Sequence, residues 1–586
     1  MLKKHTLYTF FLLSLLFILF SCSSIIARLP KKAYPFILYP VRKIRPFEFP
    51  HPNDKATLKI ARNEYELLMF GITNFTETDL EVNKIIININ YDTKLNMNIF
   101  LVEYCNITTS SRWFDKPGKR GRWPDPLIPI KELEGFDNNP VSIDFFPPLK
   151  IPACENRILL CELYLGEDEY IAQSNIRFTL FTNNEQNFTL SATILPWDFT
   201  LPKTQSVRTA CKLDKSTVIS KHKQLSNSLF NEEKLYLDYL HLLARHKLSV
   251  LSPHNKPIPY KIEASGTLYF DWTEFDSLTG AMLDGTLFAD APPLTSFLIP
   301  KPASGLSDDK YNLFLKELVI HLEKNHWLDR MFVYLKDEPL IRDYPQIKKR
   351  ISHIKEKYPQ IQTLITEAYV PNLHNVVDIF CPDLVFCGDT VPFTPLFFKG
   401  RHPNMEYQLA TPAFLYKSLS RKNKMAWLFT CASAQAFDYP NLFIDSPAIY
   451  SRILPWIMYK YGFSGLLYYS VNINYLRNQN PWSNQLNIAS SIASANGDGN
   501  LLYPGYDKLK YIEGHIPVPS LRMKLLREGL EDFEYLMLLE KYSKKNTANM
   551  LCQKIVFNSI IWEHNDLKLQ DLISRIGYMI EELMKK

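Results

Sequence analysis

The sequence has no Cys-x-x-Cys pair, no histidine cluster beside its cysteines and no strong excess of either charge. Lysine and arginine exceed aspartate and glutamate by only 6 in 586 residues, and the charges are scattered along the chain. This distribution gives no basic stripe for nucleic acid and no polybasic arm for a membrane surface. The absence of ligand spacings argues against a structural zinc site. We therefore expect neither a nucleic-acid partner nor a bound metal.

The cysteines that follow Cys22 have no pairing pattern of their own. We expect most of them to be buried free thiols, which behave as small apolar side chains. Export of the chain would permit disulfides, and Cys154 with Cys161 is one alternative pair. The cysteines after Cys22 are Cys105, Cys154, Cys161, Cys211, Cys381, Cys387, Cys431 and Cys552.

A long apolar run occurs within the first 21 residues and nowhere else in the sequence. Lys3 and Lys4 precede apolar residues 7–20, a length that suits a signal-peptide core and is short for a span of ~20 residues. The sequence LFSC, ending at Cys22, resembles a bacterial lipobox, in which the cysteine is lipidated; a plain signal peptide is the alternative. We predict a lipid anchor at Cys22 in a bacterial cell envelope. The periplasmic face is favoured over the cell surface because no acidic run follows Cys22.

The rest of the chain divides into three regions by pattern. Residues 33–202 contain short runs such as LEVNKIIININY and SNIRFTLFT between Asn, Asp, Pro and Gly, which predicts a β-sandwich. Residues 203–517 alternate amphipathic stretches with short apolar runs, which predicts a parallel sheet and, at this length, a (β/α)8 TIM-like barrel. Because about seven candidate strands can be counted, closure of the barrel is inferred. Residues 518–586 predict a helical region packed on the barrel.

Several individual elements follow from the same patterns. Amphipathic spacing predicts helices over 231–246, 307–324 and 343–357. The runs KLSVLS, MFVYLK, IQTLIT, MAWLFT and GLLYYS are predicted strands. Ser520 is the predicted cap of a tail helix, on which we expect Arg527 and Glu531 to form surface ion pairs rather than to act in catalysis.

One predicted strand, MFVYLK, ends on two adjacent carboxylates, Asp337 and Glu338, followed by Pro339. The carboxyl ends of barrel strands carry the chemistry of barrel enzymes. Since neighbouring strand residues point to opposite sides, both groups reach one pocket only where the strand ends, and Pro339 should hold Glu338 extended there. Two close carboxylates repel, so one should stay protonated nearer neutrality, as a general acid requires. The alternative is a plain strand end at which Glu338 faces solvent or pairs with Lys336.

Polar and aromatic residues also follow the other predicted strands. Flat aromatic faces and fixed hydrogen-bonding groups are what a sugar site needs; the alternative for each residue is a place in the core or on the barrel rim. The candidate substrate-binding residues are Tyr334, Glu367, Tyr369, Asp389, Trp427, Tyr468, Tyr469, Asn472 and Trp482.

Four separated motifs occur in an order that resembles glycoside hydrolase family 123 and its relatives, which share a C-terminal domain of unknown function. The motifs are VYLKDEP, YPNLFIDSPAIYSRILPWIMYKYGFSGLLYYSVN, NGDGNLLYPG and PVPSLRMKLLREGLEDFEYLMLL. The resemblance implies exo-acting β-N-acetylgalactosaminidase activity by substrate-assisted retention, without a metal or an organic cofactor. It implies that Glu338 protonates the leaving oxygen and later activates water. Asp337 would hold the acetamide N–H while the acetamide oxygen attacks the anomeric carbon.

The sugar itself stays open at this stage. Tyr469 stands where relatives commonly carry a tryptophan, and Tyr475 stands at a position that we match to another aromatic, so the preference for N-acetylgalactosamine is uncertain. Two alternatives remain: a glycosidase of the same fold acting on a different sugar, and a glycan-binding lipoprotein without catalysis. The expected partner is a glycan with a terminal N-acetylhexosamine, and the expected membrane contact is through the lipid anchor alone.

Overall fold

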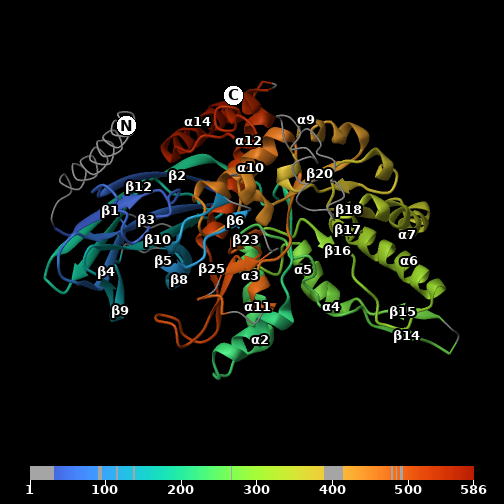
Figure 1. Cartoon of the computed structure of the whole chain (residues 1–586), viewed down its shortest axis with the longest axis horizontal. Helices are drawn as coiled ribbons and strands as arrows, with labels where there is room; N and C mark the ends of the chain where they lie inside the picture. Colours follow the sequence, from blue (N-terminus) through green and yellow to red (C-terminus); the bar gives the residue numbers. More distant parts are fainter. Residues whose placement is uncertain are drawn as a thin grey trace, which may run out of the picture.

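The computed structural model describes most of the chain and divides it into a β-rich half and a barrel half (Figure 1). The described residues are 32–89, 95–113, 116–135, 139–264, 267–387, 413–437, 439–476, 480–483, 485–488, 493–544 and 546–585. The predicted signal peptide, Cys22 and Asp389 lie outside them. None of the helices in the described part of the chain combines the length and the apolarity that a bilayer crossing requires. Its eight cysteines are all free thiols, so the Cys154–Cys161 alternative does not form.

The N-terminal region is a β-sandwich of two five-stranded sheets, drawn in blue and teal in Figure 1. The first sheet runs β1 (Tyr34–Leu38), β3 (Glu64–Asn74), β10 (Glu155–Leu165), β5 (Asn96–Ile107) and β8 (Gly121–Leu133). The second runs β2 (Lys55–Arg62), β12 (Asn187–Thr200), β11 (Ser174–Thr182), β4 (Leu80–Ile89) and β9 (Val141–Ile151). All neighbours are antiparallel except β2 and β12.

Alternation along the strands places the sandwich core between the two sheets. In β11, Ile176, Phe178 and Leu180 are buried while their neighbours are more exposed, as a half-solvated antiparallel strand requires. Phe70 of the first sheet stacks on Phe178 of the second with ring centroids 4.3 Å apart. Strand β3 is instead buried along its whole length. Its outer face therefore packs against the rest of the protein, and the first sheet is the docking face of the sandwich.

Seven parallel strands between Arg208 and Tyr468 form a nearly closed barrel. Their order is β13 (Arg208–Cys211), β21 (Gly465–Tyr468), β20 (Met425–Phe429), β19 (Ile379–Phe380), β18 (Gln362–Ile365), β17 (Met331–Tyr334) and β16 (Phe297–Leu298). The predicted strands MFVYLK, IQTLIT, MAWLFT and GLLYYS are confirmed as β17, β18, β20 and β21. Apolar side chains such as Phe332, Leu364 and Trp427 fill the interior.

The predicted (β/α)8 barrel is wrong, because its eighth strand does not form. The run KLSVLS contributes a single bridge, Val250 to Cys211. At this seam three hydroxyls take backbone N–H groups: Thr209 accepts from Ser249, Ser249 from Thr295, and Thr295 from Thr209, each at 2.9 Å. Side-chain hydroxyls thus compete with the strand ladder. The alternation also fails after β18, where a short turn over Pro371–Leu373 replaces a helix.

Helices and short elements surround the barrel. The predicted helices are confirmed as α3 (Glu232–Arg245), α6 (Asp308–Lys324) and α7 (Tyr344–Lys357). Asn231 caps α3 by accepting the N–H of Lys234 at 3.0 Å, which satisfies one otherwise unpaired helix donor. The remaining helices are α2 (Lys215–Leu225), α4 (Thr273–Phe275), α5 (Ala281–Leu283), α9 (Ala413–Tyr416), α10 (Ile449–Tyr461) and α11 (Ile473–Leu476). The small strands are β14 (Tyr260–Ile262), β15 (Leu268–Phe270), β22 (Leu486–Ile488), β23 (Ala493–Asn496), β6 (Arg112–Trp113), β7 (Lys116–Pro117), β24 (Leu502–Gly505) and β25 (Ile516–Pro519).

The helical tail is small and is more deeply buried than the sequence predicts. It consists of α12 (Leu521–Tyr542), α13 (Thr547–Cys552) and α14 (Asp566–Met584), and Ser520 caps α12 as expected. Helix α12 packs on α10 and also on strands β3 and β8 of the sandwich. Arg527 and Glu531 are therefore 0% and 2% exposed, and the expected surface ion pairs are wrong. Arg527 instead lies 2.7 Å from Glu162 of the sandwich.

Candidate functional site

The parallel strands bring their carboxyl ends to one face of the barrel, where barrel enzymes place their chemistry. Strand β17 ends at Tyr334, and Asp337 and Glu338 follow on this face. The phenol of Tyr334 donates a hydrogen bond to Oδ1 of Asp337 at 2.7 Å. Asp337 is therefore fixed by the last residue of its own strand.

Thr366, just beyond the end of β18, organises the pair. Its hydroxyl donates to Oδ1 of Asp337 at 3.0 Å and accepts the backbone N–H of Glu338 at 2.7 Å. Since β17 and β18 are neighbours in the sheet, one side chain from the next strand sets the positions of both carboxylate residues. No hydrogen-bond partner of the Glu338 carboxyl group is found among the described residues.

The backbone at Glu338 differs from the extended conformation that we expected before Pro339. Its φ is +39°, in the left-handed region that non-glycine residues rarely occupy. Proline disfavours the right-handed helical region for the residue before it, and the hydrogen bond to Thr366 holds the alternative that the chain adopts. Such strain costs on the order of 1–3 kcal/mol and persists where surrounding structure enforces it.

The environment of Glu338 suits a general acid. Asp337 and Glu338 are both exposed to solvent on this face. The protein atoms around the Glu338 carboxyl group still desolvate it in part, which raises the pKa of Glu338, and the neighbouring Asp337 carboxylate raises this pKa further. The alternative pairing with Lys336 does not occur, because Lys336 forms an ion pair with Asp343 at 2.7 Å. Glu338 thus has no cation to stabilise its anionic form within the described residues.

Three more carboxyl groups are buried at the same face, on the loops after β18, after β19 and before β24. Glu367, Asp383 and Asp498 are each at most 2% exposed, and burial raises the pKa of each to about 7. The charge of Glu338 also raises the pKa of Glu367 and of Asp383. Glu338 therefore interacts with both, so that these carboxyl groups belong to one site.

Cys431, after β20, contacts this group of buried carboxyl residues. Its thiol donates to Oδ2 of Asp383 at 3.6 Å. Burial raises the pKa of the Cys431 thiol well above its ordinary value, and the charges of Asp383, Asp498 and Glu338 raise this pKa further. The Cys431 thiol thus contacts Asp383 and interacts electrostatically with Asp498 and Glu338.

The loop that carries Asp498 is shaped by two glycines and held by tyrosines. Gly497 and Gly499 have φ of +79° and +70°, which glycine adopts without strain. A Cβ at Gly499 would lie 2.4 Å from the hydroxyl of Tyr469. The phenol of Tyr468 donates to Oδ1 of Asp498 at 3.5 Å and accepts the N–H of Gly499 at 2.7 Å. Tyr468 and Tyr469 thus meet this loop at the barrel face, and their role in substrate binding stays a prediction.

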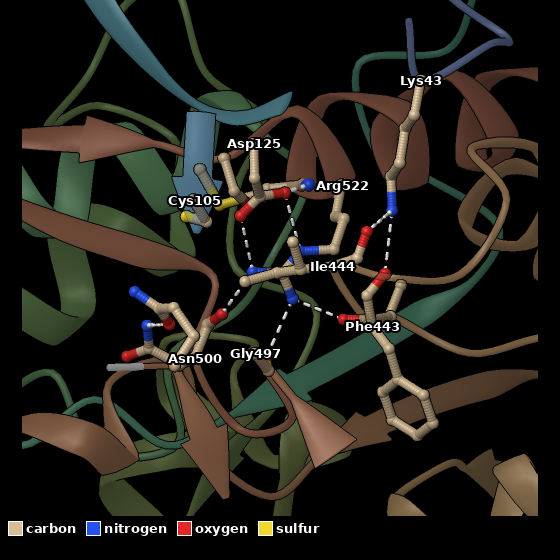
Figure 2. A network of polar contacts seen from close by, with 12 residues as sticks. Lys43, Cys105, Asp125, Phe443, Ile444, Gly497, Asn500 and Arg522 are labelled. Carbon is tan, nitrogen blue, oxygen red and sulfur yellow. Dashed lines mark hydrogen bonds and ion pairs between the residues drawn. The ribbon is translucent and has the colours of Figure 1, made fainter. Parts of the chain in front are cut away.

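A buried arginine from the tail holds the backbone of the same loop (Figure 2). Arg522 of α12 donates to the carbonyl oxygens of Gly497 at 2.9 Å and Asn500 at 2.8 Å. It also forms a bidentate ion pair with Asp125 of β8, at 2.8 and 2.9 Å. Both side chains are 0% exposed. The sandwich therefore contributes a charge that fixes the backbone on both sides of Asp498.

Lys43, from the sandwich, supports the segment beside this loop (Figure 2). Its ammonium group donates to the carbonyl oxygens of Phe443, Ile444 and Ser446, each at 2.8 Å. Burial lowers the pKa of Lys43 to about 7, against the opposite effect of Asp125. Ile444 in turn donates its N–H to the carbonyl oxygen of Asn496 at 2.9 Å, which ties this segment to the loop of Asp498.

Two predicted aromatic residues lie away from the carboxyl groups. Trp427 is 0% exposed inside the barrel, where its ring meets Phe332 edge-on at 5.4 Å. Tyr369 packs in the apolar layer that includes residues of α7, with its ring 5.0 Å from that of Phe380. Trp427 lies inside the barrel because it is in the middle of β20 rather than at its end.

Two further predicted residues join elements to each other. The amide of Asn472 donates to the hydroxyl of Thr217 at 3.1 Å and so connects its loop to α2. The indole N–H of Trp482 donates to the carbonyl oxygen of Pro504 at 2.9 Å, and its ring packs beside Tyr503. Neither contact points to the carboxyl group of Glu338.

Sequence reasoning left three residues of the site out of the candidate set: Thr366, Asp383 and Asp498. Asp383 follows an apolar run and Asp498 stands inside the NGDG motif, so both carried a signal of strand-end or turn position. Thr366 carried none, because a threonine at a strand end is ordinary. In the described part of the chain, no group of three or more His, Cys, Asp or Glu side chains could hold a metal ion.

Comparison with known proteins agrees with this geometry. Residues 298–539 match the family described as glycoside hydrolase 123, catalytic domain. The match indicates a glycoside hydrolase. The matched segment of this chain includes Asp337, Glu338, Thr366, Asp383 and Asp498. No curated protein matches the sequence.

Among solved structures, a family 123 glycoside hydrolase from Clostridium perfringens, studied for the details of glycolipid glycan hydrolysis, has the same overall fold. Its TM-score is 0.60 at 14% identity, over 94% of this chain and 98% of that one. Spo0M from Bacillus subtilis has a TM-score of 0.15 at 10% identity, over 33% of this chain and 56% of its own. A DUF4466 family protein from Parabacteroides merdae has a TM-score of 0.17 at 8% identity, over 41% and 64%. The last two values are too low to bear on the fold.

Proposed function

We propose that the protein is an exo-acting β-N-acetylhexosaminidase that prefers β-N-acetylgalactosaminides and uses substrate-assisted retention. The observation that carries the proposal is the pair formed by Asp337 and Glu338, joined through Thr366. A retaining enzyme with its own nucleophile needs two carboxyl groups about 5–5.5 Å apart on either side of the sugar. Adjacent residues held by one hydroxyl suit a substrate that supplies the nucleophile itself.

In the first step, the raised pKa of Glu338 keeps its carboxyl group protonated nearer neutrality. Glu338 gives this proton to the glycosidic oxygen as the bond between that oxygen and the anomeric carbon breaks. The acetamide oxygen of the substrate forms a new bond to the same carbon, which yields an oxazolinium ion. Asp337 accepts a hydrogen bond from the acetamide N–H and so stabilises the positive charge that develops there.

In the second step, the Glu338 carboxylate takes a proton from water while the water oxygen attacks the anomeric carbon. The bond to the acetamide oxygen breaks, and the sugar leaves with its original configuration. Tyr334 and Thr366 both donate to Oδ1 of Asp337, which leaves Oδ2 available for the acetamide.

The test is hydrolysis of paired chromogenic β-N-acetylgalactosaminide and β-N-acetylglucosaminide substrates by the chain without its first 21 residues. Release from the galacto compound, lost by at least about 100-fold in Glu338→Gln, is expected. Glu356→Gln, at an exposed position of α7, is the matched control. Full activity in Glu338→Gln would rule out its role, and release from the gluco compound alone would reverse the sugar preference.

A lipid anchor at Cys22 in a bacterial envelope, with the periplasmic face favoured, stays part of the proposal. Its support is the sequence LFSC after an apolar run. Fractionation of cells that express the full chain or Cys22→Ser tests it. Membrane association is expected for the full chain and release into the soluble fraction for the variant; equal fractionation of both would contradict the anchor.

A further inference from the structure

A cavity of about 380 Å³ opens on the same barrel face, beside the strand that carries the catalytic pair. Its walls come from residues that follow β13, the bridge at Val250, and β16. Strand β16 pairs with β17, and the N–H of Ile299 donates to the carbonyl oxygen of Phe332 at 3.0 Å. The volume lies in the range of small-molecule sites.

The floor of this cavity rests on the same apolar cluster as residues beside Asp337 and Glu338. Leu251 and Leu298 line it, and both pack on the apolar cluster in the barrel interior. Tyr334 and Cys431 pack on that same cluster. Tyr334 holds Asp337, so the cavity extends the catalytic face toward the first strands of the barrel.

The walls are positively charged. Lys212, Lys256 and Lys301 line the cavity, and Lys256 is paired with Glu274 at 3.0 Å. Lys212 and Lys301 have no ion pair within the described ranges. The acidic residue of the lining, Asp214, caps α2, whose Thr217 N–H donates to it at 2.8 Å, and it also interacts with the charge of Lys212.

Polar groups are also available deeper in the wall. The side chain of His254 is only 7% exposed, and its Nδ1 has no hydrogen-bond partner among the described residues. Its other ring nitrogen lies 3.5 Å from Glu274. Burying a polar atom without a partner is unfavourable, and a ligand oxygen or a water bound with the ligand would supply the missing hydrogen bond.

We propose that this cavity is a subsite for an acidic sugar residue, carrying a sulfate ester or a carboxylate, on the leaving-group side of the cleaved bond. The inference rests on the proposed function, since the terminal N-acetylhexosamine would fill the pocket at Glu338 and the rest of the glycan must extend across the face. The apolar floor suits a sugar ring, and the lysines of the wall, which outnumber its one acidic residue, suit the anion. The substrate class is then an acidic glycan capped by a β-linked N-acetylhexosamine.

The test uses matched oligosaccharides that differ at the residue next to the terminal sugar, which is neutral, sulfated or carboxylated. Binding is measured by calorimetry, and kcat/KM is measured on the same compounds and on the chromogenic monosaccharide glycoside. We expect at least one acidic compound to exceed the neutral one by about tenfold in affinity and in kcat/KM. The identity of the preferred compound shows whether the subsite takes a sulfate ester or a carboxylate. The preference should weaken with salt, as exposed charges are screened.

The double variant Lys212→Gln/Lys301→Gln should lose the preference and keep its activity on the monosaccharide glycoside. Lys316→Gln, at an exposed position of α6, should keep both. Equal binding of acidic and neutral compounds, or an unchanged preference in the double variant, would overturn the subsite. Absence of turnover with all compounds would contradict the proposed function instead, and the binding comparison would still decide the subsite.

Discussion

The backbone N–H of Glu338 donates a hydrogen bond to the hydroxyl of Thr366 over 2.7 Å. The same hydroxyl contacts Asp337, so a residue of one strand determines where two groups of the neighbouring strand lie. The positive φ of Glu338 depends on this contact, because little else in its sequence favours a left-handed backbone. The geometry of the proposed catalytic pair, Asp337 and Glu338, therefore rests on Thr366.

Replacement of Thr366 by valine keeps the shape of the side chain and removes the hydroxyl. We expect kcat to fall about tenfold or more, since a lost hydrogen bond of about 1.4 kcal/mol in the transition state corresponds to a factor of ten. KM should change little because the substrate is bound by other groups. Thr366→Ser, which retains the hydroxyl, should recover most of the activity; equal kcat in the two variants would show that the hydroxyl is not needed.

The pH dependence of kcat/KM should have a basic limb set by Glu338. As the acid that must start protonated, Glu338 becomes inactive when pH rises through its raised pKa. Asp337→Asn removes a negative charge that raises this pKa, so the limb of the residual activity should move to lower pH. If the limb stays at the same pH in Asp337→Asn, the group that titrates is not influenced by the charge of Asp337, and the assignment to Glu338 is wrong.

The free energy of unfolding should also depend on pH through the buried carboxyl group of Asp383. Its pKa is about 7 in the folded chain and about 3.9 when unfolded, so the folded state binds more protons between these values. Its contribution is fully present below about pH 4 and is lost as pH rises to about 7, with a slope of at most about 1.4 kcal/mol per pH unit. Denaturant unfolding at several pH values should show a smaller loss in Asp383→Asn than in the native chain, because Glu367 and Asp498 still contribute to it. The exposed Asp309→Asn is the control, and parallel curves for all three proteins would contradict the assignment.

Arg522 offers a test of how the sandwich supports the site. Arg522→Met leaves Asp125 buried without its partner, which costs about 3–5 kcal/mol, and the midpoint of thermal unfolding should fall by several degrees. Arg522→Met/Asp125→Leu removes both charges and should recover stability but not activity, because the carbonyl oxygens of Gly497 and Asn500 still lack their donor. Recovery of full activity in the double variant would show that the loop of Asp498 needs no anchor.

Much of this arrangement could be predicted from the sequence. Strand β17 and the helices α3, α6 and α7 follow from local periodicity, and the pair after β17 follows from a strand ending in two acids and a proline. The missing eighth strand could not be predicted, because Thr209, Ser249 and Thr295 meet only in the folded barrel. Trp427 looked like a binding residue because alternation does not say whether a mid-strand side chain reaches the rim.

The burial of the charged residues of α12 could not be predicted from the sequence. Arg527 and Glu531 have the spacing of a solvated helix face, and sequence alone does not reveal that Glu162 of the sandwich lies opposite. Burial alone would raise the pKa of Glu162, but Arg527 and Lys524 hold it well below its ordinary value. A charged helix face can therefore be an interface when another domain supplies the opposite charges.

The ion pair between Asp125 and Arg522 has a consequence for how such an activity can be inherited. The family match begins at residue 298, yet strand β13 and Asp125 both precede it. A gene fragment that encoded the matched segment alone would specify a sheet with an open edge and a catalytic loop whose arginine has lost its counter-charge. Shuffling of this activity between genomes should therefore move the sandwich and the barrel together, as a single heritable unit.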